Sequence, residues 1–174
     1  MRRKDVVVGT VPTQNRRQDA VRLRGHILLC LQGFRGKGYS QDFVDNLAGI
    51  HRDLAEHPDR RVEVVDRADD VCGACPNLAL SGCTLNGKGS EASIQAQDRH
   101  VLDLLRLRAG ESVQWGEVLD RIRTSLTGDS LADICGSCRW LPLGYCQEGI
   151  ERLRKEKALS DQLVAHNEKL TADG

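Results

Sequence analysis

The 174-residue chain has few aromatic side chains, with two Phe, two Tyr and two Trp making up 3% of its residues. Its core must therefore be built from Leu, Val, Ile and Ala, which is enough for a thin core in which metal cross-links would matter. Neither sign of charge is in excess, since 25 basic and 25 acidic residues cancel. This balance gives no indication of nucleic acid or an anionic membrane as a partner.

Long apolar runs are also absent. No segment approaches the roughly 18 consecutive apolar residues that span a bilayer, so no membrane association is expected. The basic start of the chain is followed only by the short apolar run at 6–8, which predicts no export signal. We therefore expect a cytoplasmic protein with reduced thiols. The chain also contains no nucleophile elbow, phosphate-binding loop or dinucleotide fingerprint, so no motif indicates an enzyme.

Cysteine, by contrast, is frequent and regularly spaced. Six of the seven cysteines form two copies of the pattern C-x2-C-x7-C: Cys72, Cys75 and Cys83, then Cys135, Cys138 and Cys146. The flanks match as well, because seven of the 14 columns that begin at Asp70 and Asp133 are identical. In a reducing compartment this pattern favours metal or redox chemistry over structural disulfides, and the odd cysteine count agrees with that interpretation.

Each triplet supplies three thiols, one fewer than the usual four ligands of zinc or of an iron–sulfur cluster. The first predicted helix offers two more ligands, His26 and Cys30, whose four-residue spacing places them on one face. Together with the two triplets they would complete one site of four Cys and one of three Cys and a His. Two other partitions stay open. Both C-x2-C turns could share one site, leaving Cys30, Cys83 and Cys146, or one site could keep an open iron.

Triplets with a separate fourth thiol favour an iron–sulfur cluster, because zinc ligands usually come as paired knuckles. The Cys75-Pro76 dipeptide supports this preference, since Cys-Pro recurs at bacterial ferredoxin clusters. We expect one or two [4Fe-4S] clusters that serve electron transfer or redox sensing with a redox partner protein. The alternative is a zinc-stabilised binding module, and a third interpretation is an enzyme with an open cluster iron.

The segment Arg22–Cys30, followed by Gly33–Ser40, resembles the start of a small bacterial and archaeal family, the domain-of-unknown-function family DUF1284. The Cys-x2-Cys-Pro segment and Cys138–Trp140 resemble it too, so the resemblance covers residues 20–155. It implies iron–sulfur binding without an established activity. The family has two adjacent histidines before Leu-Leu-Cys, and the second position is Ile27 here, which leaves only the first as a candidate ligand.

Hydrophobic periodicity predicts a mostly α fold with one or two short strands, in a small single domain with its two cysteine loops between helices. Ser40 is a good N-cap for the second helix. Helices are expected over 20–34, 40–56, 91–107, 115–126 and 148–156, and a strand over 61–66. The domain boundaries expected are a disordered arm over 1–19, a cysteine-rich metal-binding domain over 20–158 and a polar tail over 159–174.

Several of these residues also have simpler interpretations. Cys30 could pack as a small hydrophobe, and His26 could be hydrogen-bonded or solvated. Arg24 could simply be solvated. Asp70 and Asp133, at equivalent places before the two triplets, are expected to cap turns. The remaining histidines follow no ligand spacing and are expected at the surface: His51, His57, His100 and His166.

Overall fold

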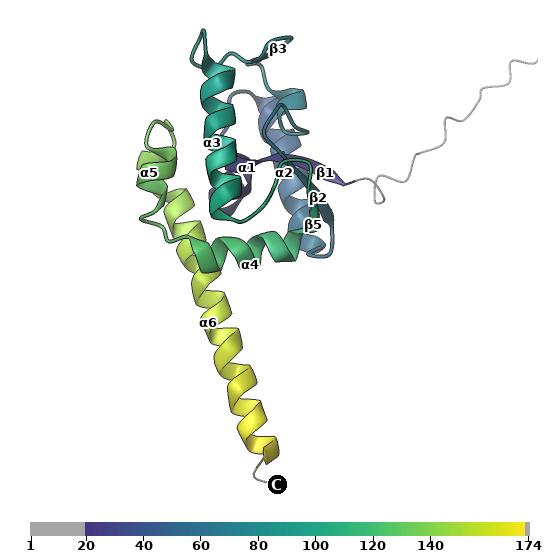
Figure 1. The fold of residues 1–174 in the computed structure, drawn as a ribbon, viewed down its shortest axis with the longest axis vertical. Helices are drawn as coiled ribbons and strands as arrows, with labels where there is room; N and C mark the ends of the chain where they lie inside the picture. The colour runs from purple at the N-terminus through teal and green to yellow at the C-terminus, as the bar shows by residue number, and fades with distance from the viewer. Residues whose placement is uncertain (1–19, 173–174) are drawn as a thin grey trace, which may run out of the picture.

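Helices make up most of the regular structure in residues 20–172, the part of the chain that the computed structural model describes (Figure 1). In chain order, with η for a 3-10 helix, the elements are β1 (Val21–Arg24), α1 (Gly25–Cys30), η1 (Leu31–Gly33), α2 (Gln41–Glu56), β2 (Arg61–Val65), η2 (Cys72–Ala74), β3 (Leu78–Ala79), β4 (Gly82–Cys83), α3 (Ser90–Leu104), β5 (Ser112–Gln114), α4 (Trp115–Ser125), α5 (Leu131–Cys135), η3 (Leu141–Leu143) and α6 (Tyr145–Ala172). The predicted class, a mostly α single domain with a few short strands, is confirmed. The arm predicted over 1–19 lies outside the described residues.

A three-stranded sheet of order β1-β2-β5 joins segments that are distant in the sequence. β1 and β2 run parallel with α1 and α2 in the crossover between them, whereas β5 pairs antiparallel with β2. The helix predicted over 20–34 is therefore wrong at its start, where residues 21–24 form β1. Val21 and Leu23 alternate onto a buried face, and the backbone of β1 bonds to β2 rather than to a following helical turn. The strand predicted over 61–66 is confirmed as β2.

The other predicted helices are present, with different ends. Ser40 caps α2 as expected, its hydroxyl accepting the Phe43 N–H at 3.2 Å. The helix predicted over 148–156 is much longer in the structure, because α6 continues through part of the segment expected as a polar tail and ends at Ala172. In Figure 1 the C-terminal part of α6 extends away from the other elements.

The core is aliphatic, as the shortage of aromatic residues predicts, and Trp115 and Phe43 are its only buried aromatic side chains among the described residues. The side chains that are fully excluded from solvent come from the sheet and from five helices: Leu23, Leu28, Val62, Val64, Val101, Val118, Ile122, Leu131 and Ile150. Of the helices in residues 20–172, none combines the length and the apolar character needed to cross a bilayer.

Glycine allows η1 to pack directly against the first turns of α6. A methyl group on Gly33 would lie 2.5 Å from the Cα of Cys146, and one on Gly149 would overlap the carbonyl oxygen of Gln32. A Cβ atom at either position would therefore push the two helices apart. This close approach brings the end of α1, where Cys30 lies, next to the start of α6.

Substituting Gly149 by alanine should therefore destabilise the protein by about 3 kcal/mol, because the new methyl group meets backbone that cannot rotate away. Gly49 offers a matched control: it is an exposed residue inside α2, and a methyl group added there would have no atom within 4 Å. Gly49→Ala should stabilise the protein by about 0.5–1 kcal/mol through helix propensity alone. Thermal denaturation followed by circular dichroism measures both, and equal melting temperatures for the two variants would contradict the packing described.

Candidate functional site

The two C-x2-C turns have the same pattern of backbone hydrogen bonds. The Cys75 N–H donates to the carbonyl of Cys72 at 2.9 Å, and the Cys138 N–H donates to the carbonyl of Cys135 at 2.8 Å. In each turn, the leucine three residues after the second cysteine donates to that cysteine's carbonyl, at 3.1 and 3.2 Å. The third cysteines of the triplets then diverge, since one ends β4 and the other lies in the first turn of α6. The likeness in structure is therefore local to the turns.

Cys30 lies beside the second triplet. Burial raises the pKa of the Cys30 thiol well above its usual value, and the next largest causes are the neighbouring thiols of Cys146, Cys135 and Cys138. We call these four residues the Cys30 cluster. They come from α1, from the end of α5, from the loop after it and from α6. The structure thus brings four cysteines together from segments more than 100 residues apart.

Burial and the neighbouring thiols act on other members of the Cys30 cluster as well. Burial and the neighbouring thiols of Cys138 and Cys146 raise the pKa of Cys135 to about 11, and burial together with Cys138 raises the pKa of Cys146. Thiolates repel one another and so raise one another's pKa, and a cation that binds between them offsets this repulsion. In the absence of a cation, the thiols of the Cys30 cluster favour the protonated form.

The first triplet, Cys72, Cys75 and Cys83, is held by two carboxylates. Asp69 accepts the Cys72 N–H at 2.8 Å, and Glu91 accepts the Cys83 N–H at 2.7 Å. Burial, followed by the charge of Asp69, raises the pKa of Cys72 to about 12. The backbone of this triplet is thus tied to the loop before it and to the first turn of α3.

The turn-capping role predicted for Asp70 belongs instead to its neighbour Asp69. Asp70 accepts the N–H of Arg22 at 2.8 Å and so extends the edge of β1. Asp69 bonds in two directions, to the N–H of Cys72 and, at 2.7 Å, to that of Arg24. Aligning the two triplets places Asp70 opposite Asp133, which is why the sequence predicts a capping role for Asp70. Capping depends on which side chain faces the turn, and here it is Asp69.

Three side chains donate hydrogen bonds to cysteine sulfur atoms. Asn77 donates to Cys75 at 3.8 Å and Ser90 donates to Cys83 at 3.8 Å, while Gln97 donates to Cys135 at 3.7 Å. Ser90 and Gln97 both lie on α3, so this helix contacts both triplets. Hydrogen bonds to sulfur favour the thiolate form and tune the potential of an iron–sulfur cluster.

Tyr39 lies near thiols of both sets of cysteines, and its ring contacts that of Trp140. Their ring centroids are 4.7 Å apart. Burial raises the pKa of Tyr39, and the next causes are charges on Cys30 and Cys138, with a smaller contribution from Cys75. Because thiols of both sets act on one phenol, the first triplet adjoins the Cys30 cluster at this aromatic pair.

The sequence patterns did not predict the buried ion-pair network that lies next to the cysteines. Arg24, for which a solvated side chain was one expectation, is 1% exposed. Its guanidinium donates to Asp98 at 2.6 Å and to Glu91 at 3.0 and 3.1 Å. Burial alone would lower the pKa of Arg24, but the two carboxylates hold it above its usual value. Asp98 is fully buried. Glu91 and Asp98 are seven residues apart on α3, a spacing that places both on one face and is the one clue the sequence holds.

His26 is bound by the same network. Its ring Nδ1 lies 2.6 Å from one oxygen of Asp98, and its backbone N–H donates to that oxygen at 3.1 Å. A carboxylate at Nδ1 fixes the ring and leaves Nε2 as the nitrogen with a free lone pair, which is how metal-binding histidines are commonly oriented. The side chain of His26 is 21% exposed, so Nε2 is not sealed in the core.

Sulfur dominates the donor chemistry of the candidate site. Among the side chains that the structure describes, no three His, Cys, Asp or Glu form a group that could hold a single metal ion. The ligands of a zinc ion all lie about 2.3 Å or less from one point. The ligands of a cuboidal cluster each bind a different iron and stand farther apart. The four thiols of the Cys30 cluster supply the number of ligands that either kind of site uses.

Comparison with known proteins gives one match. The model of a family described as "Protein of unknown function (DUF1284)" matches residues 38–144, more than half of the chain. The matched segment contains both C-x2-C turns and Cys83, while Cys30 and Cys146 lie just outside it. No curated protein and no solved structure matches the chain.

Proposed function

The chain belongs to the DUF1284 family, whose function is unknown, and we propose that it is an iron–sulfur protein that serves electron transfer or redox sensing. It would hold one or two [4Fe-4S] clusters. The observation that carries this proposal is the Cys30 cluster, in which a thiol from α1 joins the second triplet. Four thiols from four separate segments suit a cuboidal cluster, which accepts ligands from several directions.

The residues divide between two sites. Cys30, Cys135, Cys138 and Cys146 would hold one cluster. Cys72, Cys75 and Cys83 would hold the second, with Nε2 of His26 as the fourth ligand. Asp98 supports a ligand role for His26 because it occupies Nδ1 of the histidine and leaves the other nitrogen free.

Hydrogen-bond donors and helix N-terminal ends near the sulfur atoms would offset part of the cost that burial imposes on the thiolates at both sites. A bound cluster supplies a reversible one-electron change, and the chain supplies the surroundings that set how readily this happens. Ser90 and Gln97 donate to one sulfur of each set, and the positive N-terminal ends of α3 and α6 lie beside Cys83 and Cys146. Ser90 and Gln97 are seven positions apart on α3, which corresponds to about 10 Å along the helix axis. The two sites would therefore be neighbours.

Structural zinc is the second candidate, since four thiols also suit this metal. A zinc-stabilised binding module would need the Cys30 cluster to close around one point. All seven cysteines are free of disulfides, which suits a reducing compartment such as the cytoplasm. In that setting the protein would exchange electrons with a redox partner protein.

The test of redox function is reversible reduction of the anaerobically purified full chain. We expect broad visible absorption that dithionite bleaches and that returns on mild oxidation, because the chain's thiolates hold an iron–sulfur chromophore. A chromophore that resists every reductant would indicate a structural cluster and contradict electron transfer. A colourless protein that carries zinc would favour the binding module.

A further inference from the structure

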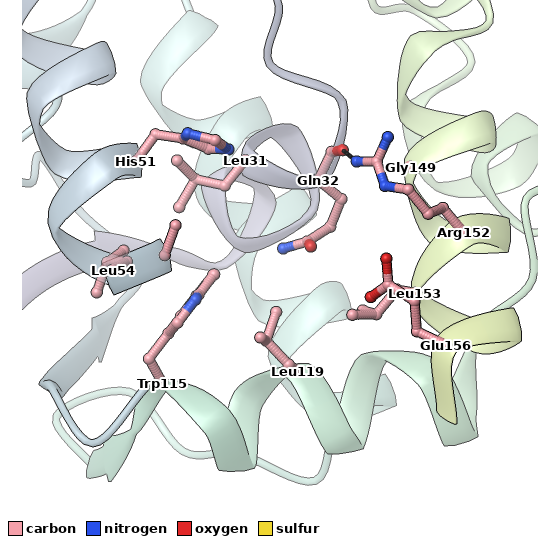
Figure 2. A pocket seen from close by; sticks show the side chains of 11 residues that line it. Leu31, Gln32, His51, Leu54, Trp115, Leu119, Gly149, Arg152, Leu153 and Glu156 are labelled. Atoms are coloured by element: carbon pink, nitrogen blue, oxygen red, sulfur yellow. Dashed lines mark hydrogen bonds between the residues drawn. The ribbon is translucent and has the colours of Figure 1, made fainter. Parts of the chain in front are cut away.

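A pocket of about 170 Å³ lies between α2, η1, α4 and α6, away from the side chains assigned to the metal sites (Figure 2). Its floor and walls are apolar: Leu31, Leu54, Ala55, Leu119 and Leu153. The indole of Trp115 rises into it between Leu54 and Leu119 (Figure 2). An apolar cavity with a few polar groups at its rim is the usual form of a small-molecule site.

A guanidinium and a carboxylate stand at the exposed rim of this pocket. Trp115 is 5% exposed, and its indole forms part of the wall. Arg152 uses one N–H to reach the carbonyl of Gln32 at 3.3 Å, so its remaining donors are free. Glu156 forms no ion pair with any described residue, although it stands one turn from Arg152 on α6. The pocket thus offers unused donors and an unused carboxylate beside an apolar floor.

His51 forms part of the wall. Its ring packs on Phe34 with centroids 5.7 Å apart, which holds it at the pocket. Burial lowers the pKa of His51, and the charge of Arg152 lowers it further. The guanidinium therefore acts across the cavity, where it makes the potential positive. An anionic group entering the pocket is favoured beside Arg152 and not beside Glu156.

We propose that this pocket binds a free α-amino acid with an aliphatic side chain. The ligand carboxylate would accept from Arg152 at the rim, and its ammonium group would donate to Glu156. Side chains one helical turn apart have Cβ atoms about 5–6 Å apart, a spacing that suits the two adjoining charged groups of a zwitterion. The aliphatic side chain would rest on the leucines of the floor.

A ligand with only one charge would leave either Arg152 or Glu156 without a partner. A simple carboxylate would also face repulsion from Glu156, and a simple amine from Arg152. The site should therefore select for the zwitterion over either half of it. Binding would depend on pocket residues alone and would not require metal at the cysteines.

The test is isothermal titration of the full-length protein, purified anaerobically, with L-leucine. Isocaproate and isoamylamine serve as the matched ligands that lack the ammonium and the carboxylate. We expect leucine to bind at least tenfold more tightly than either, since each missing charge removes a charged hydrogen bond. Arg152→Gln and Glu156→Gln should each weaken leucine binding by roughly tenfold. The control Lys155→Gln, an exposed residue on α6 outside this pocket, should leave it unchanged.

The outcomes separate the alternatives. Isocaproate binding as tightly as leucine, with Glu156→Gln harmless, would make this a carboxylate site and overturn the proposal. Absence of leucine binding up to about 10 mM would overturn it as well, since weaker binding falls below any useful affinity. Both glutamine variants change exposed residues and should keep the melting temperature of the natural sequence, so loss of binding would not reflect unfolding.

Discussion

Replacing Cys30 by serine should remove about half of the iron from a chain in which both sites are loaded, because the Cys30 cluster loses its fourth thiol. The three remaining cysteines of that cluster come from α5, the loop after it and α6, and only Cys30 connects them to α1. The first triplet keeps all its ligands in this variant. Iron content and visible absorption after anaerobic reconstitution measure the loss.

Ser137→Ala is the matched control for Cys30→Ser. Ser137 is exposed and lies inside the second C-x2-C turn, and no described residue bonds to its hydroxyl. This variant should keep the full iron content. A Cys83→Ser variant should show the complementary loss, from the first site only. If Cys30→Ser retains the iron and the spectrum of the natural protein, Cys30 is a core residue and not a ligand.

Replacing Asp98 by asparagine should destabilise the protein by about 3–5 kcal/mol, the usual cost of breaking a buried ion pair. Asp98 is fully buried and accepts hydrogen bonds from Arg24 and His26. Asparagine has the same shape but leaves the buried guanidinium with Glu91 as its one remaining carboxylate. It also removes the charge that orients the ring of His26. Urea denaturation followed by circular dichroism gives the change in the free energy of unfolding.

The matched control for Asp98→Asn lies on the surface. Asp66 bonds the guanidinium of Arg99 at 2.7 Å, and the arginine side chain is 62% exposed. Asp66→Asn should cost less than about 1 kcal/mol, because solvent screens an exposed pair. A loss at Asp98 no larger than the loss at Asp66 would mean that the buried network contributes little to stability.

Local patterns predicted the local features of this fold. The helical period located α2 and α4, and the N-cap signal at Ser40 is confirmed by its bond to Phe43. The repeated cysteine spacing predicted two pseudo-repeated loops, and these remain a prediction, although both C-x2-C turns have the same pattern of backbone hydrogen bonds. These features depend on residues within a few positions of one another, so a single sequence contains the information for them.

Features that depend on distant residues could not be predicted in this way. β1 is a strand because it pairs with β2, about 40 residues later, and its four residues alone also fit a helical period. Arg24 is buried because Asp98, 74 residues away, accepts its charge. The ligand shortage in each triplet pointed to Cys30 and His26, but only packing through Gly33 and Gly149 decides which triplet Cys30 joins.

The most direct test of the account is the content of iron, acid-labile sulfide and zinc in the full chain after anaerobic purification and reconstitution. We predict iron and sulfide in equal amounts, about four of each for every loaded site, and negligible zinc. Protein that carries zinc without sulfide, or that takes up neither iron nor sulfide, would contradict the proposal that these cysteines hold iron–sulfur clusters.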